Sequence, residues 1–427
     1  MDSFAYKDGV YTCEGLSLDS LARDFGTPAY VYSEQTVTDH YTKLDKALAP
    51  IPHRICYSVK TNSNLAILAH MAALGSGFDI VSGGELFRVL KAGGDASKIV
   101  FAGVGKTPEE MRQAIDAGIM MFNIESIPEA ETLSRIATEA GKDVRIAVRI
   151  NPDVAPDTHH YITTGKKETK FGLPIDKAVE VFHAIGRLDR LMPVGIHCHI
   201  GSQITELGPY QETLEKIGPL IERLRQDGFD IRYFNLGGGL GIIYKEEAPS
   251  SAARFAETVL PALTAMKIEL LMEPGRFIVG NAGVLLTRVI YIKETGTKTF
   301  AIVDAGMNDL VRPTLYGAYH EILPVRRKDA AKKIYDVVGP VCETGDFFAK
   351  DRSIEELRSG DLVAIKSAGA YGFVMASNYN SRPRPPEIWI SEGRARIGRR
   401  RETYDDLVAA ETEAFETAMA TRIRLGG

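Results

Sequence analysis

The feature that most constrains the fold is an alternation of a short apolar run with a helical pattern, repeated eight times between residues 34 and 280. Repeated strand–helix units of this kind build a parallel sheet covered by helices. Eight units over about 250 residues predict a closed (β/α)8 barrel of the α/β class, in preference to an open doubly wound sheet. The expected strands are residues 55–59, 78–81, 99–102, 120–124, 144–150, 193–199, 233–236 and 268–272.

Helical segments are expected between these strands and before the first one. One spans residues 34–49, and the others begin near Asn64, Gly84, Pro108, Ile127, Asp176, Tyr210 and Ser251. Several of these starts carry a capping residue or a first-turn proline, which is typical of helix N-termini.

Beyond residue 281 the pattern changes to strand-like runs with no helices between them. These runs are residues 284–292, 298–303, 333–338, 361–365 and 387–390, and a last helix is expected near residues 404–418. Strand-like runs also occur at residues 10–13 and 29–32. We therefore expect residues 34–280 to form the barrel, and residues 1–33 with 281–427 to form a second, mostly β domain.

Charge and cysteine content argue against several classes of partner. A net charge of −5 offers no broad positive surface, so nucleic acid is not an expected partner. The basic run from Arg394 to Arg401 is followed by acidic residues and is expected to be a solvated face. The four cysteines are far apart and form no C-x-x-C pair, which indicates a reducing compartment and no thiolate metal site. No segment resembles a leader or a membrane span, so we expect a cytoplasmic protein without a membrane partner.

The residues expected at the carboxyl ends of the barrel strands, where barrel enzymes place their chemistry, are unusually polar. Lys60 follows the first strand, and Asp79 lies at the end of the second. A lysine at a strand end is usually an ordinary surface charge. In a ring of polar groups, however, desolvation and neighbouring cations lower the pKa of an amine, which can then form a Schiff base. Lys60 is therefore the candidate for attachment of a cofactor.

A run of glycines, Gly237, Gly238 and Gly239, follows the seventh strand. Loops after the seventh and eighth strands of barrels bind phosphate through backbone N–H groups, and glycine permits the close approach. Ser202 and Gly275 lie on neighbouring loops, so a phosphate site is favoured over an ordinary tight turn. No Gly-Lys-Ser/Thr follows the run, which argues against a Walker A loop.

Two histidines and a glutamate complete the expected site. His197 and His199 are two residues apart on a strand and could in principle ligate a metal, but no third ligand is evident nearby. No metal is therefore expected, and stacking of His199 on a flat cofactor explains that residue better. Glu273 ends the eighth strand, where a carboxylate beside a pyridine nitrogen would keep that nitrogen protonated. An ion pair between Glu273 and Arg149 is the structural alternative.

These motifs resemble the fold type III pyridoxal-phosphate decarboxylases, which combine a barrel with an alanine-racemase-like β domain. The matching segments are YSVKTN at 57–62, FDIVSGGE at 78–85, TG at 164–165, KFG at 170–172, HCHIGSQ at 197–203, GGGLG at 237–241 and EPGR at 273–276. Phe277, which follows Arg276, departs from the serine more usual in the family.

The second domain narrows the resemblance to the branch of this family that acts on diaminopimelate. The similar segments are DAGMND at 304–309, RP at 312–313, LYG at 315–317, GPVCE at 339–343 and AYG at 370–372. Ornithine-type relatives typically carry Asp where this chain has Glu343, so the match favours a substrate with a second amino-acid head group.

The resemblance implies a role for each matching residue. Lys60 would carry pyridoxal 5'-phosphate as a Schiff base, with Glu273 at the pyridine nitrogen. The other cofactor contacts would come from Asp79, His199, Ser202, Gly237, Gly238, Gly239, Gly275, Arg276 and Tyr371. The distal carboxylate of the substrate would be held by Arg276, Arg312, Tyr316 and Tyr371, for which guanidinium forks are apt.

Two further roles fall on neighbouring residues of the second domain. Glu343 would pair with the distal ammonium of the substrate. Cys342 would donate a proton to Cα, although an isolated cysteine is more usually a small buried apolar residue. In this family both residues reach the neighbouring subunit's site, so an obligate homodimer with two shared sites is implied.

The implied activity is the removal of CO2 from meso-2,6-diaminopimelate, a diamino dicarboxylic acid, to give L-lysine. Two alternatives stay open. One is a decarboxylase of the same fold that acts on ornithine, arginine or carboxynorspermidine. The other is a cofactor-binding homologue without catalytic activity.

Overall fold

The computed structural model describes residues 3–154 and 170–425. The chain divides into two compact units, here called the barrel unit (Glu34–Ala282) and the β unit (Asp2–Ser33 with Gly283–Gly427). The boundary lies within two residues of the change in sequence pattern near residue 281.

The barrel unit contains the eight predicted strands as one closed parallel sheet. Closure is made by pairing of the last strand with the first, and each strand also pairs with its neighbour in chain order. The closed barrel is therefore confirmed, and an open sheet is excluded. The strands are β5 (His53–Ser58), β6 (Gly77–Ile80), β7 (Ile99–Phe101), β8 (Met121–Ile124), β9 (Val144–Asn151), β11 (Leu191–His197), β12 (Tyr233–Asn235) and β13 (Glu269–Met272).

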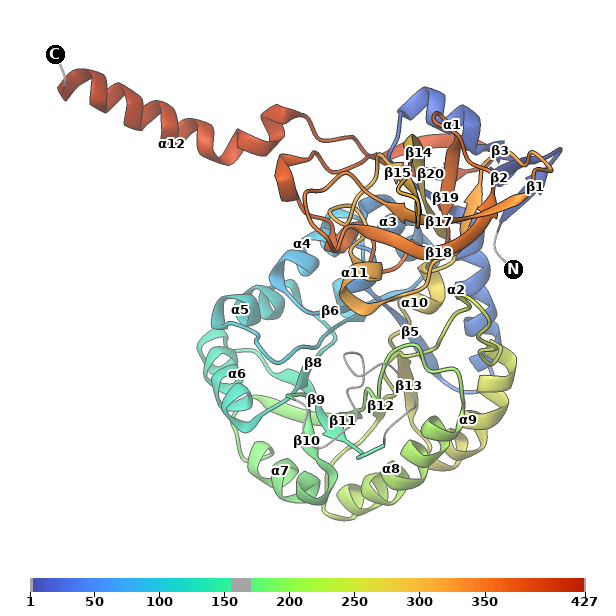
Figure 1. Cartoon of the computed structure of the whole chain (residues 1–427). Helices are drawn as coiled ribbons and strands as arrows, with labels where there is room; N and C mark the ends of the chain where they lie inside the picture. The colour runs from blue at the N-terminus through green and yellow to red at the C-terminus, as the bar shows by residue number, and fades with distance from the viewer. Residues whose placement is uncertain (1–2, 155–169, 426–427) are drawn as a thin grey trace. The chain divides into compact units, whose positions relative to one another are not determined.

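Figure 1 shows the helices of this unit as a ring outside the strands. Serine and threonine caps start several of them: Ser82 and Ser126 accept from backbone N–H groups, and Thr107 forms a capping box ahead of Pro108. The helices are α2 (Glu34–Leu48), α3 (Leu65–Ala73), α4 (Gly83–Lys91), α5 (Pro108–Ala117), α6 (Ile127–Ala140), α7 (Ala178–Ile185), α8 (Gly208–Gln226), α9 (Ala252–Met266) and the short α10 (Arg276–Val279).

Apolar side chains from several strands pack together in one buried cluster of the barrel, which includes Cys56, Val100, Met121, Ala147 and Leu271. With the barrel packed in this way, polar groups are accommodated at the strand ends. One predicted end is wrong in detail: β11 stops at His197, so His199 belongs to the loop that follows.

The β unit is organised around β14 (Gly283–Glu294), which pairs with β4 (Ala29–Ser33), β15 (Thr299–Val303) and β19 (Leu362–Ile365). Through β4, the N-terminal segment therefore contributes a strand to this sheet. The remaining elements of the unit are β1 (Phe4–Lys7), β2 (Val10–Cys13), β3 (Leu16–Ser17), α1 (Leu18–Phe25), α11 (Arg312–Tyr316), β16 (Ile322–Pro324), β17 (Lys332–Val338), β18 (Phe347–Glu355), β20 (Glu387–Ser391), β21 (Arg394–Arg399) and α12 (Tyr404–Leu425).

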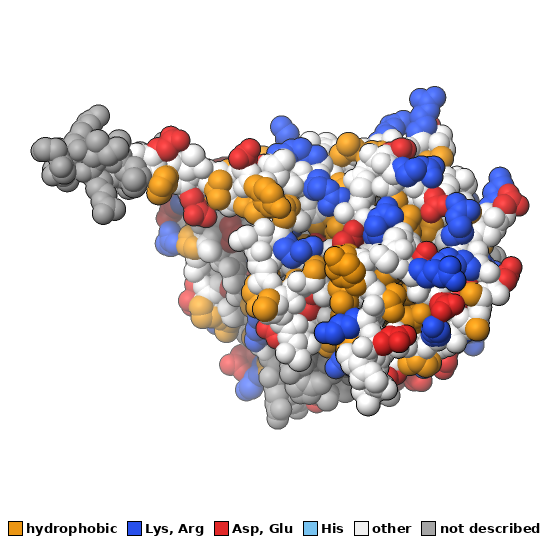
Figure 2. Space-filling model, turned by 45° about the horizontal axis from the view of Figure 1, so that its top comes forward, with side chains coloured by type: hydrophobic (Ala, Val, Ile, Leu, Met, Phe, Trp, Pro, Cys, Tyr) orange, Lys and Arg blue, Asp and Glu red, His pale blue; other side chains and the backbone are white. Residues whose placement is uncertain are grey.

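The basic run near the C-terminus forms β21 and the segment after it. Arg394, Arg396 and Arg400 are exposed, as expected of a solvated face. Arg401 differs, because its guanidinium donates to the carbonyls of Phe25 and Pro28. On the face shown in Figure 2, basic and acidic side chains are interspersed. None of the helices in the described ranges has the length and apolar character that a bilayer crossing needs.

Candidate active site

A cavity of about 400 Å³ in the barrel unit contains three of the predicted residues, Lys60, His199 and Glu273. Its walls come from the carboxyl ends of the strands and from the loops after them. The other lining residues are Val81, Ala102, Gly103, Val104, Gly105, Arg149, Phe171 and His197. The arrangement places an amine, an imidazole and a carboxylate around one space.

Lys60 lies in a single 3-10 turn, Val59–Thr61, directly after β5. Its Nζ donates to Oδ2 of Asp79 at 2.8 Å, and Ser58 Oγ donates to the same oxygen at 2.5 Å. Asp79 is fully buried, and within the described residues its Oδ1 has no hydrogen-bond partner. Burial and the nearby Glu273 raise the pKa of Asp79, against the opposing effect of Lys60.

Glu273 is held by three buried side chains. Asn235 and Asn123 donate to its Oε1 at 2.6 and 3.2 Å, and His197 Nε2 lies 3.3 Å from its Oε2. Although burial alone raises it, the pKa of Glu273 lies well below its usual range, because His197, Lys60 and Asn235 stabilise the anion. These contacts therefore favour the carboxylate anion of Glu273, which is one of the residues that line the cavity.

The structural alternative for Glu273, an ion pair with Arg149, is wrong. Arg149 pairs instead with Glu125, with Nη1 2.8 Å from Oε1. The guanidinium also lies 4.7 Å from the centre of the Phe171 ring. Of the motif segments before Phe171, residues 164–165 lie outside the described residues.

The two histidines have different environments. His197 faces Glu273, whereas His199 accepts a hydrogen bond at Nδ1 from the Gly238 N–H at 3.2 Å. Burial, Arg149 and Lys60 hold the pKa of His199 well below its usual value, so its imidazole is neutral with the proton on Nε2. Among the described residues no group of three or more His, Cys, Asp or Glu side chains is placed to hold a metal ion.

The glycine run follows β12 and passes close to other backbone. A Cβ on Gly238 would lie 2.2 Å from the Glu273 carbonyl oxygen, and one on Gly275 would lie 2.2 Å from Thr61 Cγ2. Gly237 and Gly239 have φ values of +68° and +101°, which side chains rarely adopt. Glycine is thus required here by packing, and the phosphate role remains a prediction.

Arg276 lies in the same unit, at the start of α10. Its guanidinium donates to Tyr244 Oη at 2.7 Å and to Ser202 Oγ at 2.9 Å. The structure therefore brings Arg276 beside Ser202, one of the residues predicted to contact the cofactor. Tyr244 was missed, and its position five residues after the glycine run is the signal that could have found it.

The other predicted residues lie in the β unit. Arg312 is buried and Tyr316 is half-buried, both on α11, while Cys342 and Glu343 are exposed on a turn before β18. The alternative that Cys342 is a buried apolar residue is therefore wrong. Thr314 Oγ1 donates to the Gly345 carbonyl at 2.5 Å, which joins α11 to this turn. Tyr371 is half-buried and has a φ of +55°.

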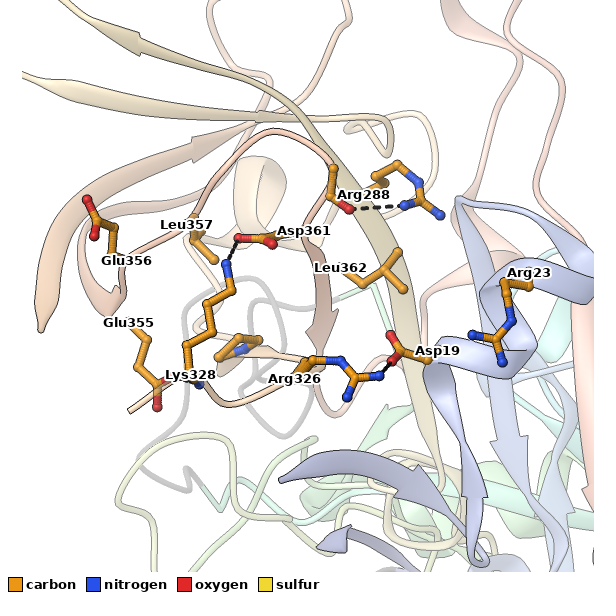
Figure 3. Close-up of a pocket in the computed structure, with 12 residues that line it drawn as sticks. Asp19, Arg23, Arg288, Arg326, Lys328, Glu355, Glu356, Leu357, Asp361 and Leu362 are labelled. Carbon is orange, nitrogen blue, oxygen red and sulfur yellow. Dashed lines mark hydrogen bonds and ion pairs between the residues drawn. The ribbon is translucent and has the colours of Figure 1, made fainter. Parts of the chain in front are cut away.

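A second hollow, of about 290 Å³, lies in the β unit and contains none of the predicted residues. Arg326 pairs with Asp19 and Lys328 pairs with Asp361 across it (Figure 3). Its lining has four acidic and four basic side chains, so their charges compensate each other. This composition is typical of a surface ion-pair network and does not indicate a reactive centre.

Comparison with known proteins defines the class. Residues 34–280 match the family model described as pyridoxal-dependent decarboxylase, pyridoxal binding domain. The class is therefore that of the pyridoxal-dependent decarboxylases. Among curated proteins, the diaminopimelate decarboxylase of Pseudomonas aeruginosa is 51% identical over 412 residues, covering 96% of this chain and 99% of the relative. The diaminopimelate decarboxylase of Aquifex aeolicus is 49% identical, covering 94% of this chain and 96% of the relative.

Solved structures give the same result. The diaminopimelate decarboxylase of Helicobacter pylori, complexed with L-lysine, has a TM-score of 0.90 and 41% identity, covering 93% of this chain and all of that one. The enzyme from M. jannaschii, in co-complex with L-lysine, has a TM-score of 0.92 and 38% identity, covering 96% and 98%. This chain belongs to the diaminopimelate decarboxylase family.

Proposed function

We propose that this protein removes CO2 from meso-2,6-diaminopimelate to give L-lysine, with pyridoxal 5'-phosphate attached to Lys60. The single observation that carries the proposal is the meeting of Lys60, His199 and Glu273 at one cavity of the barrel. The cysteines of the described residues form no disulfide, which fits the reducing conditions of the cytoplasm, where we place the reaction.

The residues present fit the cofactor. The cavity of about 400 Å³ is large enough for a substituted pyridine ring. The buried Oδ1 of Asp79 and Oδ1 of Asn123 have no hydrogen-bond partner within the described residues, so a polar ligand would satisfy them. Gly238 and Gly275 keep the rim free of side chains where a phosphate group would approach the backbone.

Each side chain of the cavity then has a task. Lys60 supplies the amine that binds the aldehyde, and Asp79 keeps this amine in place. Glu273 holds a proton on the pyridine nitrogen, because it remains ionised. The neutral His199 covers the ring face. When bound, the ring supplies the sink for the electron pair released at Cα.

The remaining cofactor contacts lie at the phosphate end. The residues assigned to the phosphate are Ser202, Gly237, Gly238, Gly239, Gly275, Arg276 and Tyr371. Arg276 already donates to Ser202, which orders both side chains for an anion.

Substrate selection is assigned to Arg276 of the barrel unit and to four residues of the β unit. Arg312, Tyr316 and Tyr371, with Arg276, hold the distal carboxylate, and Glu343 pairs with the distal ammonium. Cys342 returns a proton to Cα, for which an exposed thiol is required. The protein acts as a homodimer in which Cys342 and Glu343 complete the site of the partner subunit.

The test is CO2 release from meso-diaminopimelate, compared with ornithine, arginine and carboxynorspermidine at equal concentration. The expected result is release from diaminopimelate that depends on added cofactor and is lost in Lys60→Ala. Borohydride treatment should leave a pyridoxyl group on Lys60, identified by mass spectrometry. Faster release from ornithine would contradict the substrate, and labelled Lys60 without turnover on any substrate would support the inactive homologue.

The shared site has its own test. Lys60→Ala and Cys342→Ala proteins, each nearly inactive, should recover activity when their subunits exchange, because one site in each mixed dimer is intact. No recovery despite proven exchange would contradict the shared site.

A further inference from the structure

The turn that carries Cys342 and Glu343 is closed around one buried carboxylate. Asp346 Oδ2 accepts a hydrogen bond from the Val341 N–H at 2.6 Å. Its Oδ1 accepts another from the Met307 N–H, also at 2.6 Å. Asp346 is 5% exposed, so water does not replace these two bonds easily. One side chain therefore joins the turn to the loop before α11.

The surrounding backbone is shaped for this carboxylate. A Cβ on Gly339 would lie 2.5 Å from both oxygens of Asp346, so only glycine leaves room for them. The Asp346 N–H donates to the Glu343 carbonyl at 3.0 Å, and the Glu343 N–H donates to the Val341 carbonyl at 2.8 Å. Asp346 is thus bonded to the turn at two places, to Val341 through its carboxylate and to Glu343 through its own N–H.

Cys342 and Glu343 lie at the outer side of this turn. Both are exposed, and the Cys342 N–H donates to Asn380 Oδ1 at 2.7 Å. The Glu343 side chain contributes one long hydrogen bond, accepted at Oε1 from the Gly345 N–H at 3.4 Å, whereas the shorter bonds from the Val341 and Met307 N–H groups go to Asp346. The positions of the Cys342 thiol and the Glu343 carboxylate are therefore set by Asp346, whose own side chain is buried in the turn.

We propose that Asp346 is a positioning residue, which sets the turn bearing Cys342 and Glu343 for the site they complete. This inference rests on the proposed function, because it takes the roles of Cys342 and Glu343 from there. Asp346 acts through backbone N–H groups and does not touch the substrate.

Two substitutions disturb the carboxylate in different ways. Asp346→Asn keeps the shape but has one acceptor oxygen, so one of the two N–H groups faces an NH2 group instead. Gly339→Ala keeps the charge of Asp346 but displaces its oxygens. Asp351→Asn, at an exposed aspartate of the same unit, is the matched control.

Both variants should lower kcat about 100-fold, the size of effect expected when a reacting group is misplaced by about 1 Å. Cofactor affinity and borohydride labelling of Lys60 should stay at the wild-type level, because none of the residues assigned to the cofactor lies on the turn around Asp346. Hydrogen exchange at Met307 and Val341 should become faster, while exchange elsewhere in the β unit is unchanged. Asp351→Asn should match wild type in every measurement.

Subunit mixing separates positioning from a general loss of structure. Asp346→Asn mixed with Lys60→Ala should recover about a quarter of wild-type activity, because half the dimers are mixed and each has one intact site. Asp346→Asn mixed with Cys342→Ala should recover none, because both changes affect the same turn. Recovery in this second mixture, or wild-type kcat in Asp346→Asn, would overturn the proposal. If the wild-type protein releases no CO2 from diaminopimelate, the proposed function fails. The positioning role is overturned separately if hydrogen exchange at Met307 and Val341 is unchanged in both variants.

Discussion

Lys60 and Asp79 form an ion pair in which the two partners are buried unequally. The Nζ–Oδ2 distance is 2.8 Å, and the side chain of Lys60 is 35% exposed while that of Asp79 is fully buried. Loss of the lysine therefore leaves a charge inside the protein, whereas loss of the aspartate leaves a charge that water can reach. The ion pair therefore stabilises the buried Asp79 carboxylate more than it stabilises the partly exposed Lys60 amine.

Lys60→Ala is expected to destabilise the cofactor-free protein more than Asp79→Asn does. Removing one partner of a fully buried pair costs about 3–5 kcal/mol, and partial exposure of Lys60 places the loss near the lower end. Since burial raises the pKa of Asp79, the loss should be smaller at pH 5 than at pH 8, because the stranded carboxyl is protonated at low pH. Denaturant unfolding of both variants and of Lys60→Ala/Asp79→Asn measures this. The double variant should be more stable than Lys60→Ala at pH 8, and an equal or lower stability would contradict the argument.

Glu273→Gln is expected to lower kcat about 100-fold or more while the protein still binds the cofactor. The neutral amide cannot hold a proton on the pyridine nitrogen, but it keeps the shape of the carboxylate. Because the pKa of Glu273 lies well below its usual range, the wild-type rate should show no inflection from this group between pH 5 and 8. Steady-state kinetics across this range, with cofactor binding measured by absorbance, tests both statements. Full activity of Glu273→Gln would remove the assigned role.

The barrel could be predicted from the sequence because its strands are buried on both faces. Such strands appear as continuous apolar runs, and all eight predicted strands lie within two residues of the observed ones. β18 and β21 were missed because both carry charged residues, such as Lys350 and Arg396, and are defined by pairing with other strands. Helix α1 carried a signal that was overlooked: Ser17 caps it, and Leu18, Leu21 and Ala22 form one buried face.

The residues of the candidate site divide in the same way. Lys60 and Glu273 could be selected because charged side chains at the ends of buried barrel strands indicate a site, and Cys342 because its segment, GPVCE at 339–343, resembles the family. Asn235 and Asp346 could not, because their importance comes from contacts with Glu273 and with Met307, each 38 or 39 positions away in the chain. Ordinary polar residues of this kind become visible only when the fold brings their partners together.

Glu85 provides a test of stability against pH. Its Oε2 accepts from the Val81 N–H at 2.8 Å, and burial raises its pKa from 4.5 to about 7. The folded state therefore binds more protons than the unfolded state between these values, so stability falls as pH rises through them. Glu85→Gln keeps an acceptor for the N–H but carries no charge. Its gain in Tm over wild type should be larger at pH 8 than at pH 5, and a gain independent of pH would show that Glu85 does not titrate in this range.

Gly238→Ala tests the packing of the glycine run. The new Cβ would lie 2.2 Å from the Glu273 carbonyl oxygen, so the loop must move away from β13. We expect the apparent Kd for pyridoxal 5'-phosphate to rise at least about tenfold, because the displaced loop draws the Gly238 N–H away from His199 and alters the backbone that a phosphate would approach. Gly208→Ala, at a position with no atom within 4 Å of the added Cβ, is the control and should bind as wild type does. Titration of cofactor-free protein by absorbance measures both, and equal affinities would contradict a phosphate role for the loop.

Arg312 is oriented by the neutral side chain of His320. A substitution of Arg312 therefore tests how the substrate is selected. His320 Nδ1 donates to the Lys366 carbonyl at 2.7 Å, so its Nε2 carries a lone pair that accepts from Arg312 Nη1 at 3.0 Å. Arg312→Lys loses the planar fork that matches a carboxylate. The KM for meso-diaminopimelate should rise at least about tenfold, as one charge-assisted hydrogen bond is worth 1.5–3 kcal/mol or roughly that factor. The inhibition constant of ornithine, which has no distal carboxylate, should change little. Equal weakening of diaminopimelate and ornithine binding would show that Arg312 does not contact the distal carboxylate.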